Sequence, residues 1–388
     1  MGVPTLLVSE VFPPAHGGSG RWFWEIYRRL PRDQYLVAAG EHPRQREFDR
    51  GHDLRVFRLP LAQRSWGLKS VSGLAGYWRT ARRLRQLAWS EGVGMIHCGR
   101  CLPEGFAAWL LHWWAGLPYA VYVHGEDVTT AATSRELSWM VRRVLGGARG
   151  VIANSDSTRR ILLGDWGLPR ERVHLLHPGV DTRRFVPAPR DPVTRGQLGW
   201  GKRPVVLTVG RLQKRKGHDT LIRALPAVRR QVPDVLYAIA GDGEERVGLE
   251  RLADECGVRQ SVQFLGEVDD CRLICCYQQC DLLALPNRRV GSDIEGFGMV
   301  LLEAQSCGRP VVAGDSGGTA ETMRVGETGR VVPCDTPDAL TALLPELLAR
   351  PGELERMGEA GRRWVVERFD WDALARQARE LFDSRMSP

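Results

Sequence analysis

The sequence predicts an α/β protein made of two Rossmann-like domains, each a parallel sheet wrapped by helices. Short apolar runs rich in Val, Ile and Leu alternate with longer amphipathic segments, a pattern typical of parallel sheets buried on both faces. These runs form two series, and the chain of 388 residues is too long for one ordinary core. Two domains of similar size are therefore expected.

The expected strands lie at the Val- and Ile-rich runs. The first series comprises residues 5–9, 35–39, 54–58, 95–98, 119–123, 150–153 and 173–176. The second series comprises residues 205–209, 236–240, 262–265, 282–285, 310–313 and 329–332. Ligands of open parallel sheets bind beyond the carboxyl ends of the strands, so we expect the ligand site in a cleft between two facing domains.

A proline-rich stretch between the two series predicts the domain boundary. Residues 186–193 contain three prolines, and polar sequence with glycines follows as far as Lys202. We therefore expect an N-terminal domain over residues 1–187, a linker over 188–202 and a C-terminal domain over 203–369. The last stretch, 370–388, has a helical pattern with Asp370 as a candidate N-cap.

The composition is that of a soluble globular protein, with 43% hydrophobic and 26% charged residues. The net charge of +8 is uneven: residues 1–200 hold 28 basic and 17 acidic residues, and the remainder holds 26 and 29. Residues 51–100 alone carry 9 basic and 2 acidic residues. A nucleic acid, an acidic membrane or a phosphorylated substrate could meet this surface. Only four basic residues are lysines, and Lys214 and Lys216 are two of them.

The cysteines and the longest apolar run bear on location. Nine cysteines, in a chain whose first ten residues lack the basic start of a secretory signal, predict free thiols in a reducing cytoplasm. Residues 105–125 contain no Asp, Glu, Lys or Arg, as a membrane span would. Gly116 and Pro118 divide this run into a helix-like segment, 106–115, and a strand-like segment, 119–123, which favours buried core.

The most informative segment is 293–312, where a glycine-bearing turn leads into a helix. Such a helix start has free backbone N–H groups and a positive dipole end that can hold an anion. Glu295 stands just before this helix start, and Glu303 lies about a turn and a half inside the helix. Carboxylates beside an anion site are suited to accept hydrogen bonds from hydroxyl groups of a sugar and a ribose. The segment therefore predicts a sugar-nucleotide site.

The pattern Glu-Gly-Phe-Gly-x4-Glu-Ala from Glu295 resembles the donor site of family 4 glycosyltransferases, which have the GT-B fold of two Rossmann-like domains facing across a cleft. Residues 293–308 are similar to those of mannosyltransferases that act on phosphatidylinositol mannosides. Further stretches resemble family motifs in the family's order: 12–18, 124–126, 154–158, 177–187, 209–217, 240–243, 264–266, 308–312 and 317–321. The resemblance thus covers nearly the whole chain.

The resemblance implies a retaining glycosyltransferase that acts by front-face displacement. The N-terminal domain would bind the acceptor, the C-terminal domain the nucleotide sugar, and the final helix would cross back to the N-terminal domain. GDP-mannose is the first choice of donor, followed by UDP-glucose or UDP-N-acetylglucosamine. The acceptor would be a hydroxyl group of a lipid, a glycan or a small molecule.

The resemblance also implies roles for individual residues. The expected catalytic residues are His124, at the carboxyl end of a strand, Arg211, Lys216 and Glu295. The expected donor-binding residues are Gly17, Gly18, Gly210, Gly241, Phe264, Gly296, Phe297, Gly298, Met299, Val300 and Glu303. Arg211 offers a planar fork to phosphate oxygens and Lys216 a point charge, whereas we interpret Lys214 and Arg215 as surface charges.

No cofactor or metal is expected. Arg211, Lys216 and the helix start at 298–300 could together stabilise the charge of a departing diphosphate. The family is similarly independent of metal. The single Asp-x-Asp, Asp370 to Asp372, opens the last helix, where a capping role is expected.

Two other classes of protein remain open at this point. An epimerase or phosphorylase would share the fold, although the spacing of Glu295 and Glu303 favours transfer. The basic charge alone would suit a protein that binds a nucleic acid or a membrane without catalysis, but no recognised nucleic-acid-binding module accompanies it, so no nucleic acid is expected.

Basic helical sequence in the first domain suggests an anionic membrane surface as a partner. Arg79, Arg82 and Arg83 share a helical face, and residues 21–29 add Arg and Trp. A solvated face is an equally good interpretation. The expected location is cytoplasmic, with the inner face of the cell membrane as a candidate surface.

Overall fold

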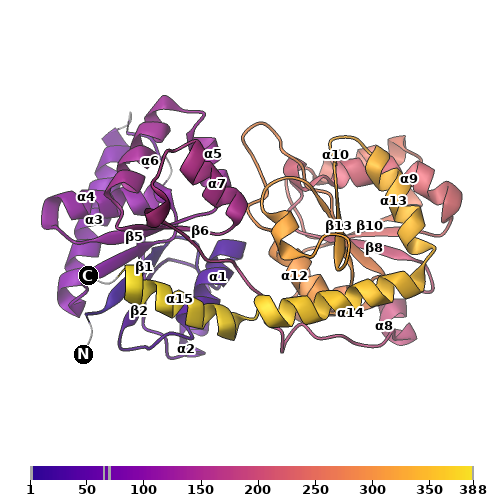
Figure 1. The fold of residues 1–388 in the computed structure, drawn as a ribbon, viewed down its shortest axis with the longest axis horizontal. Helices are drawn as coiled ribbons and strands as arrows, with labels where there is room; N and C mark the ends of the chain where they lie inside the picture. Colours follow the sequence, from indigo (N-terminus) through magenta and orange to yellow (C-terminus); the bar gives the residue numbers. More distant parts are fainter. Residues whose placement is uncertain (1–2, 64–65, 69–70, 387–388) are drawn as a thin grey trace. The chain divides into compact units, whose positions relative to one another are not determined.

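The computed structural model describes residues 3–63, 66–68 and 71–386, without the side chains of residues 71 and 72. The chain divides into two compact units (Figure 1). The first unit comprises Met1–Pro178 and Trp371–Pro388, and the second comprises Gly179–Asp370. Each unit is a parallel sheet between helices, as predicted.

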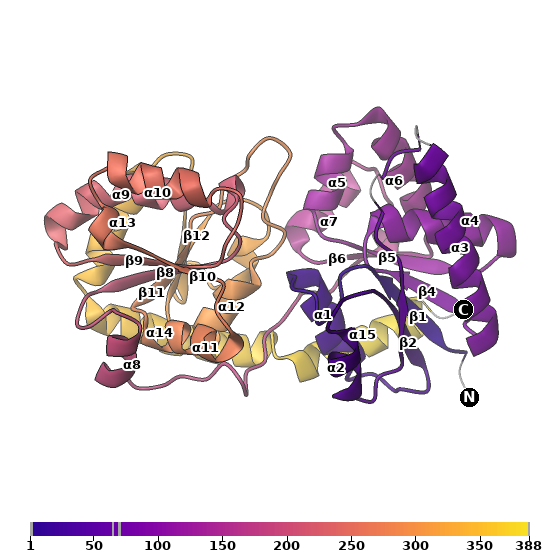
Figure 2. The same ribbon diagram turned by 180° about the vertical axis from the view of Figure 1, so that it is seen from behind.

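The first unit contains a seven-stranded sheet in the order β3-β2-β1-β4-β5-β6-β7. Its strands are β1 (Thr5–Ser9), β2 (Tyr35–Gly40), β3 (Val56–Leu59), β4 (Met95–Cys98), β5 (Tyr119–Val123), β6 (Gly150–Ala153) and β7 (Val173–Leu175). Its helices are α1 (Gly18–Tyr27), α2 (Gln45–Arg50), α3 (Val71–Glu91), α4 (Phe106–Ala115), α5 (Glu126–Ala131), α6 (Arg135–Gly147), α7 (Asp156–Gly164) and α15 (Trp371–Arg385). Helices α3, α4 and α6 cover one face of the sheet, and α1 and α15 cover the other (Figure 2).

The second unit contains a six-stranded sheet in the order β10-β9-β8-β11-β12-β13. Its strands are β8 (Val205–Val209), β9 (Leu236–Ala240), β10 (Val262–Gly266), β11 (Leu282–Leu285), β12 (Val311–Gly314) and β13 (Gly329–Val332). Its helices are α8 (Pro192–Gln197), α9 (His218–Gln231), α10 (Arg246–Glu255), α11 (Asp270–Gln279), α12 (Met299–Ser306), α13 (Asp338–Leu348) and α14 (Pro351–Arg368). Helices α9, α10 and α13 cover one face, and α8, α11, α12 and α14 cover the other (Figure 2).

The predicted linker over 188–202 is wrong, because this segment is folded into the second unit. Asp191 caps α8 by accepting hydrogen bonds from the backbone N–H groups of Val193 and Thr194. Trp200 is fully buried, and its indole Nε1 donates to Oε1 of Gln263 at 2.7 Å. The chain instead crosses between the units at Pro178 to Gly179.

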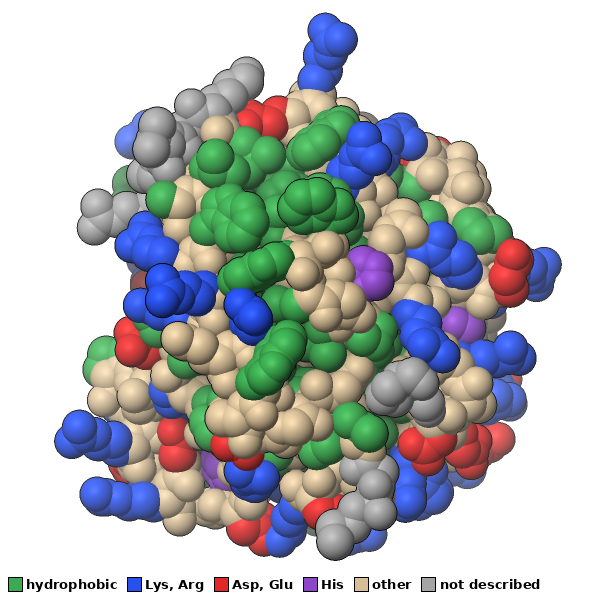
Figure 3. All heavy atoms as spheres, turned by 90° about the vertical axis from the view of Figure 1, so that its left-hand side faces the viewer, with side chains coloured by type: hydrophobic (Ala, Val, Ile, Leu, Met, Phe, Trp, Pro, Cys, Tyr) green, Lys and Arg blue, Asp and Glu red, His purple; other side chains and the backbone are tan. Residues whose placement is uncertain are grey.

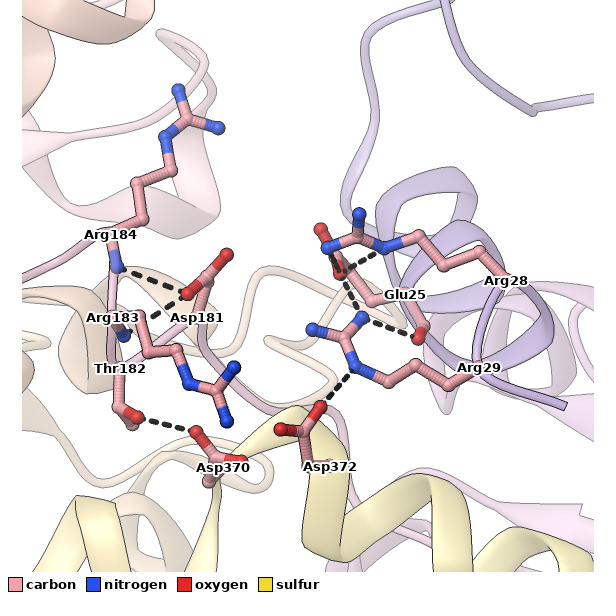
Figure 4. Close-up of polar contacts among 9 residues, drawn as sticks. All are labelled: Glu25, Arg28, Arg29, Asp181, Thr182, Arg183, Arg184, Asp370 and Asp372. Carbon is pink, nitrogen blue, oxygen red and sulfur yellow. Dashed lines mark hydrogen bonds and ion pairs between the residues drawn. The ribbon is translucent and has the colours of Figure 1, made fainter. Parts of the chain in front are cut away.

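The final helix, α15, packs on α1 within the first unit. The ring of Phe382 lies 4.6 Å from the ring of His97 and 6.2 Å from that of Tyr27. The guanidinium Nε of Arg29 donates to the carboxylate of Asp372 at 2.7 Å (Figure 4). Helix α15 therefore covers the same face of the first sheet as α1.

The apolar run over 105–125 folds as two elements, as predicted. Helix α4 ends at Ala115 and is followed by Gly116, which takes a left-handed conformation with φ of 71°, and β5 follows from Tyr119 with every residue buried. In the described part of the chain, no helix is both long enough and apolar enough to cross a membrane.

Candidate functional site

Three of the predicted donor-binding residues lie at the carboxyl edge of neighbouring strands in the second unit. Gly210 follows β8, Gly241 follows β9, and Phe264 lies near the end of β10. The N–H of Gly210 donates to the carbonyl of Ala240 at 3.0 Å. A Cβ atom on Gly241 would lie 2.0 Å from the carbonyl oxygen of Gly210. Only glycine therefore allows the two chain segments to approach this closely.

A basic turn, Lys214–Lys216, follows β8 and precedes α9. Gly217 ends this turn with φ of 72°, and a Cβ atom there would lie 1.7 Å from the carbonyl oxygen of Pro286. The turn is thus held against the end of β11. The Nζ of Lys216 lies 2.6 Å from Oε2 of Glu295. The structure therefore brings together two of the four predicted catalytic residues.

Arg215 also faces Glu295, so its interpretation as a surface charge is wrong. One guanidinium nitrogen lies 2.5 Å from Oε2 of Glu295, and Nε lies 3.1 Å from Oδ1 of Asp293. The side chain of Arg215 is 12% exposed. The sequence held a signal for this contact. Residues 214–216 are three consecutive cations, and Asp293 and Glu295 are two carboxylates that could pair with them. Lys214 is exposed, as predicted.

The buried carboxylate of Glu295 is held in its ionised form. Burial raises the pKa of Glu295, but the cations of Lys216 and Arg215 outweigh this effect and keep the pKa below its usual value. The backbone is fixed as well, since the carbonyl of Glu295 accepts the N–H of Gly318 at 3.1 Å. A Cβ atom on Gly317 would lie 1.7 Å from that same carbonyl oxygen.

Arg211 differs from its two cationic neighbours. Its side chain is exposed. Within the described ranges, no hydrogen bond or ion pair holds its guanidinium group, whereas Lys216 and Arg215 are both paired with Glu295. Arg211 is therefore the cation of this group whose donors are open to a phosphate.

Helix α12 begins at Met299, and the preceding N-cap residue, Gly298, has a φ of 91° in the left-handed region. Among the residues that the structure describes, no side chain caps this helix, so the first N–H groups, at Met299 and Val300, are available for an anion. Glu303 is buried in the same helix, where it accepts a hydrogen bond from the Tyr277 hydroxyl at 2.6 Å.

Gly296 and Phe297 connect Glu295 to this helix start. Gly296 is partly exposed, whereas the side chain of Phe297 is buried and its ring lies 6.0 Å from that of Phe369. Phe297 therefore belongs to the core, and only its backbone could contact a ligand.

His124 lies in the first unit, directly after β5. Its Nε2 lies 2.7 Å from the carbonyl oxygen of Gly99, so this nitrogen carries a hydrogen and Nδ1 is left as an acceptor. The ring packs edge-on against Trp22 and Phe23, at 5.7 and 5.9 Å between centroids. Burial lowers the pKa of His124, which favours the neutral ring. The buried, neutral ring of His124 is therefore better suited to accept a hydrogen bond through Nδ1 than to act as a cation.

Asp127 supports the backbone of His124. Its Oδ1 accepts the backbone N–H groups of His124 and Val128 at 3.1 and 3.0 Å. Its Oδ2 is buried and has no hydrogen-bond partner among the described residues, and burial raises the pKa of Asp127.

The predicted glycine loop of the first unit has a packing role. Gly17 precedes α1, and a Cβ atom there would lie 2.9 Å from Cγ1 of Val11. Gly18 is the exposed first residue of the helix. No group of three or more His, Cys, Asp or Glu side chains suited to a metal ion occurs in the part of the chain that the structure describes.

Two family models match the chain. The model of Glycosyltransferase Family 4 matches residues 16–184, and that of Glycosyl transferases group 1 matches residues 191–364. A GDP-mannose-dependent alpha-(1-6)-phosphatidylinositol monomannoside mannosyltransferase of Mycolicibacterium smegmatis is 33% identical, with 98% of each chain covered. A related mannosyltransferase of Corynebacterium glutamicum, described as acting on the monoacylated form, is 31% identical, again with 98% of each chain covered.

Solved structures show the same fold. Anabaena Alr3699/HepE, solved with UDP, has a TM-score of 0.81 and 22% identity, with 98% of this chain and 100% of that chain covered. Sucrose-phosphate synthase from Thermosynechococcus elongatus has a TM-score of 0.81 and 24% identity, with 98% of each chain covered. The family models and the relatives of 31–33% identity, rather than these structures, exclude a protein that only binds nucleic acid or membrane. The chain belongs to family 4 of the glycosyltransferases, has the GT-B fold and is a hexosyltransferase.

Proposed function

We propose that this enzyme transfers mannose from GDP-mannose to a hydroxyl group of a phosphatidylinositol mannoside, with retention of configuration. The observation that carries the proposal is the ionised Glu295, held by Lys216 and Arg215 from the basic turn that follows the exposed Arg211. The relatives named above are supporting evidence, because the matches cover 98% of each chain and the relatives' names specify this donor and this class of acceptor.

The second unit supplies the groups that a nucleoside diphosphate needs. Arg211 and Lys216 would bind the two phosphates and stabilise the negative charge that grows on them as the sugar leaves. One hydrogen of the Lys216 ammonium points to Glu295, and the other two remain for phosphate oxygens. The N–H groups at the start of α12 add a partial positive charge. We propose on this basis that transfer requires no metal ion.

The two buried carboxylates would bind the sugar and the ribose. Ionised Glu295 can accept hydrogen bonds from hydroxyl groups of mannose. Glu303 uses Oε2 to accept from Tyr277, and its position inside α12 suits contact with a ribose hydroxyl. His124, in the first unit, would accept a sugar hydroxyl through Nδ1.

Front-face displacement accounts for retention without a protein nucleophile. The acceptor oxygen forms its bond to the anomeric carbon on the face from which the diphosphate departs. The bond between the anomeric carbon and the phosphate oxygen breaks, and the diphosphate keeps its electron pair. A departing phosphate oxygen takes the proton of the acceptor hydroxyl. Arg211 and Lys216 would stabilise the charge that develops on this group.

We propose a place of action at the inner face of the cell membrane, where a lipid acceptor would be found. The basic first half of the chain supports this location, since anionic lipids attract Arg and Lys.

Thermal shift and product analysis test this proposal. A ligand that binds the folded state raises the melting temperature according to its concentration relative to Kd. We expect GDP and GDP-mannose to raise it, and UDP, UDP-glucose and UDP-N-acetylglucosamine to have little effect. Labelled mannose should then appear in phosphatidylinositol mannoside, and added chelator should not reduce the rate. Stabilisation by the uridine nucleotides alone would overturn the donor and favour a glucosyl- or N-acetylglucosaminyltransferase.

A further inference from the structure

Helix α3 has two adjacent stripes of side chains, one buried and one largely exposed to solvent. Tyr77, Ala81, Leu84 and Ala88, at helical spacing, are buried against the first sheet. The stripe one position further along the chain consists of the exposed side chains of Trp78, Arg82 and Trp89 and the half-buried side chain of Arg85. Trp89 is 58% exposed. An outward stripe of this kind would ordinarily be polar throughout.

Helix α4 adds two more exposed tryptophans, and one of them, Trp114, contacts this stripe. Trp113 is 76% exposed and Trp114 is 43% exposed. The Trp114 ring lies 5.9 Å from that of Trp78, and the Arg85 guanidinium lies over both Trp114 and Trp89, at 4.3 and 5.0 Å from their centroids. These contacts join the two helices into one continuous surface. We call it the tryptophan face and define it as Trp78, Arg82, Arg85, Trp89, Trp113 and Trp114.

Figure 3 views the molecule from the side on which α3 and α4 lie, and there hydrophobic side chains gather among Lys and Arg side chains. The charge on the two helices that form the tryptophan face is mainly positive. Helix α3 contains four arginines and a single acid, Glu91, which pairs with Arg55 outside the helix. Helix α4 contains no Asp, Glu, Lys or Arg. Cationic and aromatic groups thus share this surface, without acidic partners on either helix for the free arginines.

We propose that the tryptophan face docks the first unit onto an anionic phospholipid bilayer. Tryptophan prefers the boundary between headgroups and acyl chains, where its ring is buried and its N–H stays near water. Arginines among such rings meet anionic phosphates at the same depth. A second copy of the chain fits this surface less well, because two copies would bring arginines against arginines.

This inference rests on the proposed function only for the presence of a lipid acceptor, and it specifies which surface meets the lipid. It also revises the sequence-based expectation for residues 21–29. Trp22 is buried, and Arg28 and Arg29 are both paired with Glu25, at 2.6 and 2.5 Å (Figure 4). Trp113 and Trp114, by contrast, were expected to lie in buried core.

Sedimentation with vesicles tests the proposal on the full-length protein. Vesicles of phosphatidylcholine with about one-third phosphatidylglycerol should bind the protein at least tenfold more tightly than vesicles of phosphatidylcholine alone. The variant Trp89→Ala/Trp113→Ala should lose at least tenfold in affinity for the anionic vesicles, and so should Arg82→Glu/Arg85→Glu. Acyl chains labelled with bromine should quench tryptophan fluorescence less when Trp89 and Trp113 are replaced by phenylalanine.

The matched controls lie in the second unit. Arg223→Glu/Arg230→Glu on α9 changes charge by the same amount, and Val247→Ser on α10 removes an exposed apolar side chain. Both should bind vesicles as the parent does. Equal binding of the parent and both tryptophan-face variants would overturn the proposal. Loss of self-association in the variants, with no vesicle binding by the parent, would overturn it in favour of a second copy.

A separate measurement distinguishes this inference from the proposed function. Stabilisation by GDP-mannose reports on the second unit and shows that each variant is folded. Variants that keep this stabilisation and lose vesicle binding support the docking surface. The parent protein could instead bind anionic vesicles through the tryptophan face and show no stabilisation by GDP-mannose. That result would refute GDP-mannose as the donor but would still support the docking surface.

Discussion

The ammonium of Lys216 and the carboxylate of Glu295 are 2.6 Å apart and come from two well-separated segments of the second unit's sequence. Both side chains are about nine-tenths buried, so their charges interact with little screening by solvent. This pair joins the turn after β8 to the loop before α12. The pair therefore fixes the positions of Lys216, which is predicted to bind the diphosphate, and of Glu295, which is predicted to bind the sugar.

Glu295→Gln should destabilise the protein in a manner that depends on pH. The pKa of Glu295 is lowered in the folded state, so its contribution is complete above the unfolded-state pKa of about 4.3 and is lost as pH falls through the folded-state pKa. Removing one partner of a buried pair costs about 3 kcal/mol. Urea unfolding should show this gap at pH 7 and a smaller gap toward pH 4. Glu244→Gln, at an exposed position of the same unit, should show no gap at either pH.

Arg211→Ala and Lys216→Ala should each reduce kcat by roughly a hundredfold or more, as expected for the loss of one transition-state donor. Their effects on stability should differ, because only Lys216 is paired with Glu295. Arg211→Ala should leave the melting temperature unchanged, and Lys216→Ala should lower it. Lys214→Ala removes an exposed lysine from the same turn and should leave kcat near the parent value. Near-normal turnover in both Arg211→Ala and Lys216→Ala would refute their roles as diphosphate ligands.

Arg215→Met should reduce kcat by about tenfold through the position of Glu295, without direct contact with the donor. The guanidinium contacts Glu295 and Asp293 together, which a lysine cannot do with the same geometry. Arg215→Lys should therefore recover only part of the loss. Because Lys216 and Arg211 remain, the KM for GDP-mannose should change less than kcat. A larger change in KM than in kcat would indicate that Arg215 binds the donor itself.

Most of the fold could be predicted from the sequence because buried parallel strands are continuous apolar runs. The thirteen expected strands all occur, and the largest shift in a boundary is two residues, at the start of β3. The linker could not be predicted, because proline marks flexible segments and helix starts alike. Pro192 begins α8, and Trp200 fixes the segment that follows to the second sheet.

The site could be predicted as a set of positions but not as a set of orientations. The spacing of Glu295 and Glu303 indicated the helix start. It could not indicate that Phe297 between them faces the core. Likewise, three consecutive cations in a tight turn point in different directions, and only the folded turn shows that Arg215 faces inward while Lys214 faces out.

Gly217→Ala should disrupt the donor site, whereas Gly257→Ala should not, although both glycines have left-handed conformations with φ of 72° and 65°. That conformation alone costs an alanine about 1–2 kcal/mol at either position. A Cβ atom at Gly217 would also lie 1.7 Å from the carbonyl oxygen of Pro286, whereas nothing lies within 4 Å of a Cβ atom at Gly257. The turn must therefore move away from β11 in Gly217→Ala, and Lys216 moves with it. We expect urea unfolding to show a clearly larger loss of stability for Gly217→Ala, and GDP-mannose to stabilise Gly257→Ala alone. Equal donor binding by the two variants would show that the contact with Pro286 does not position Lys216.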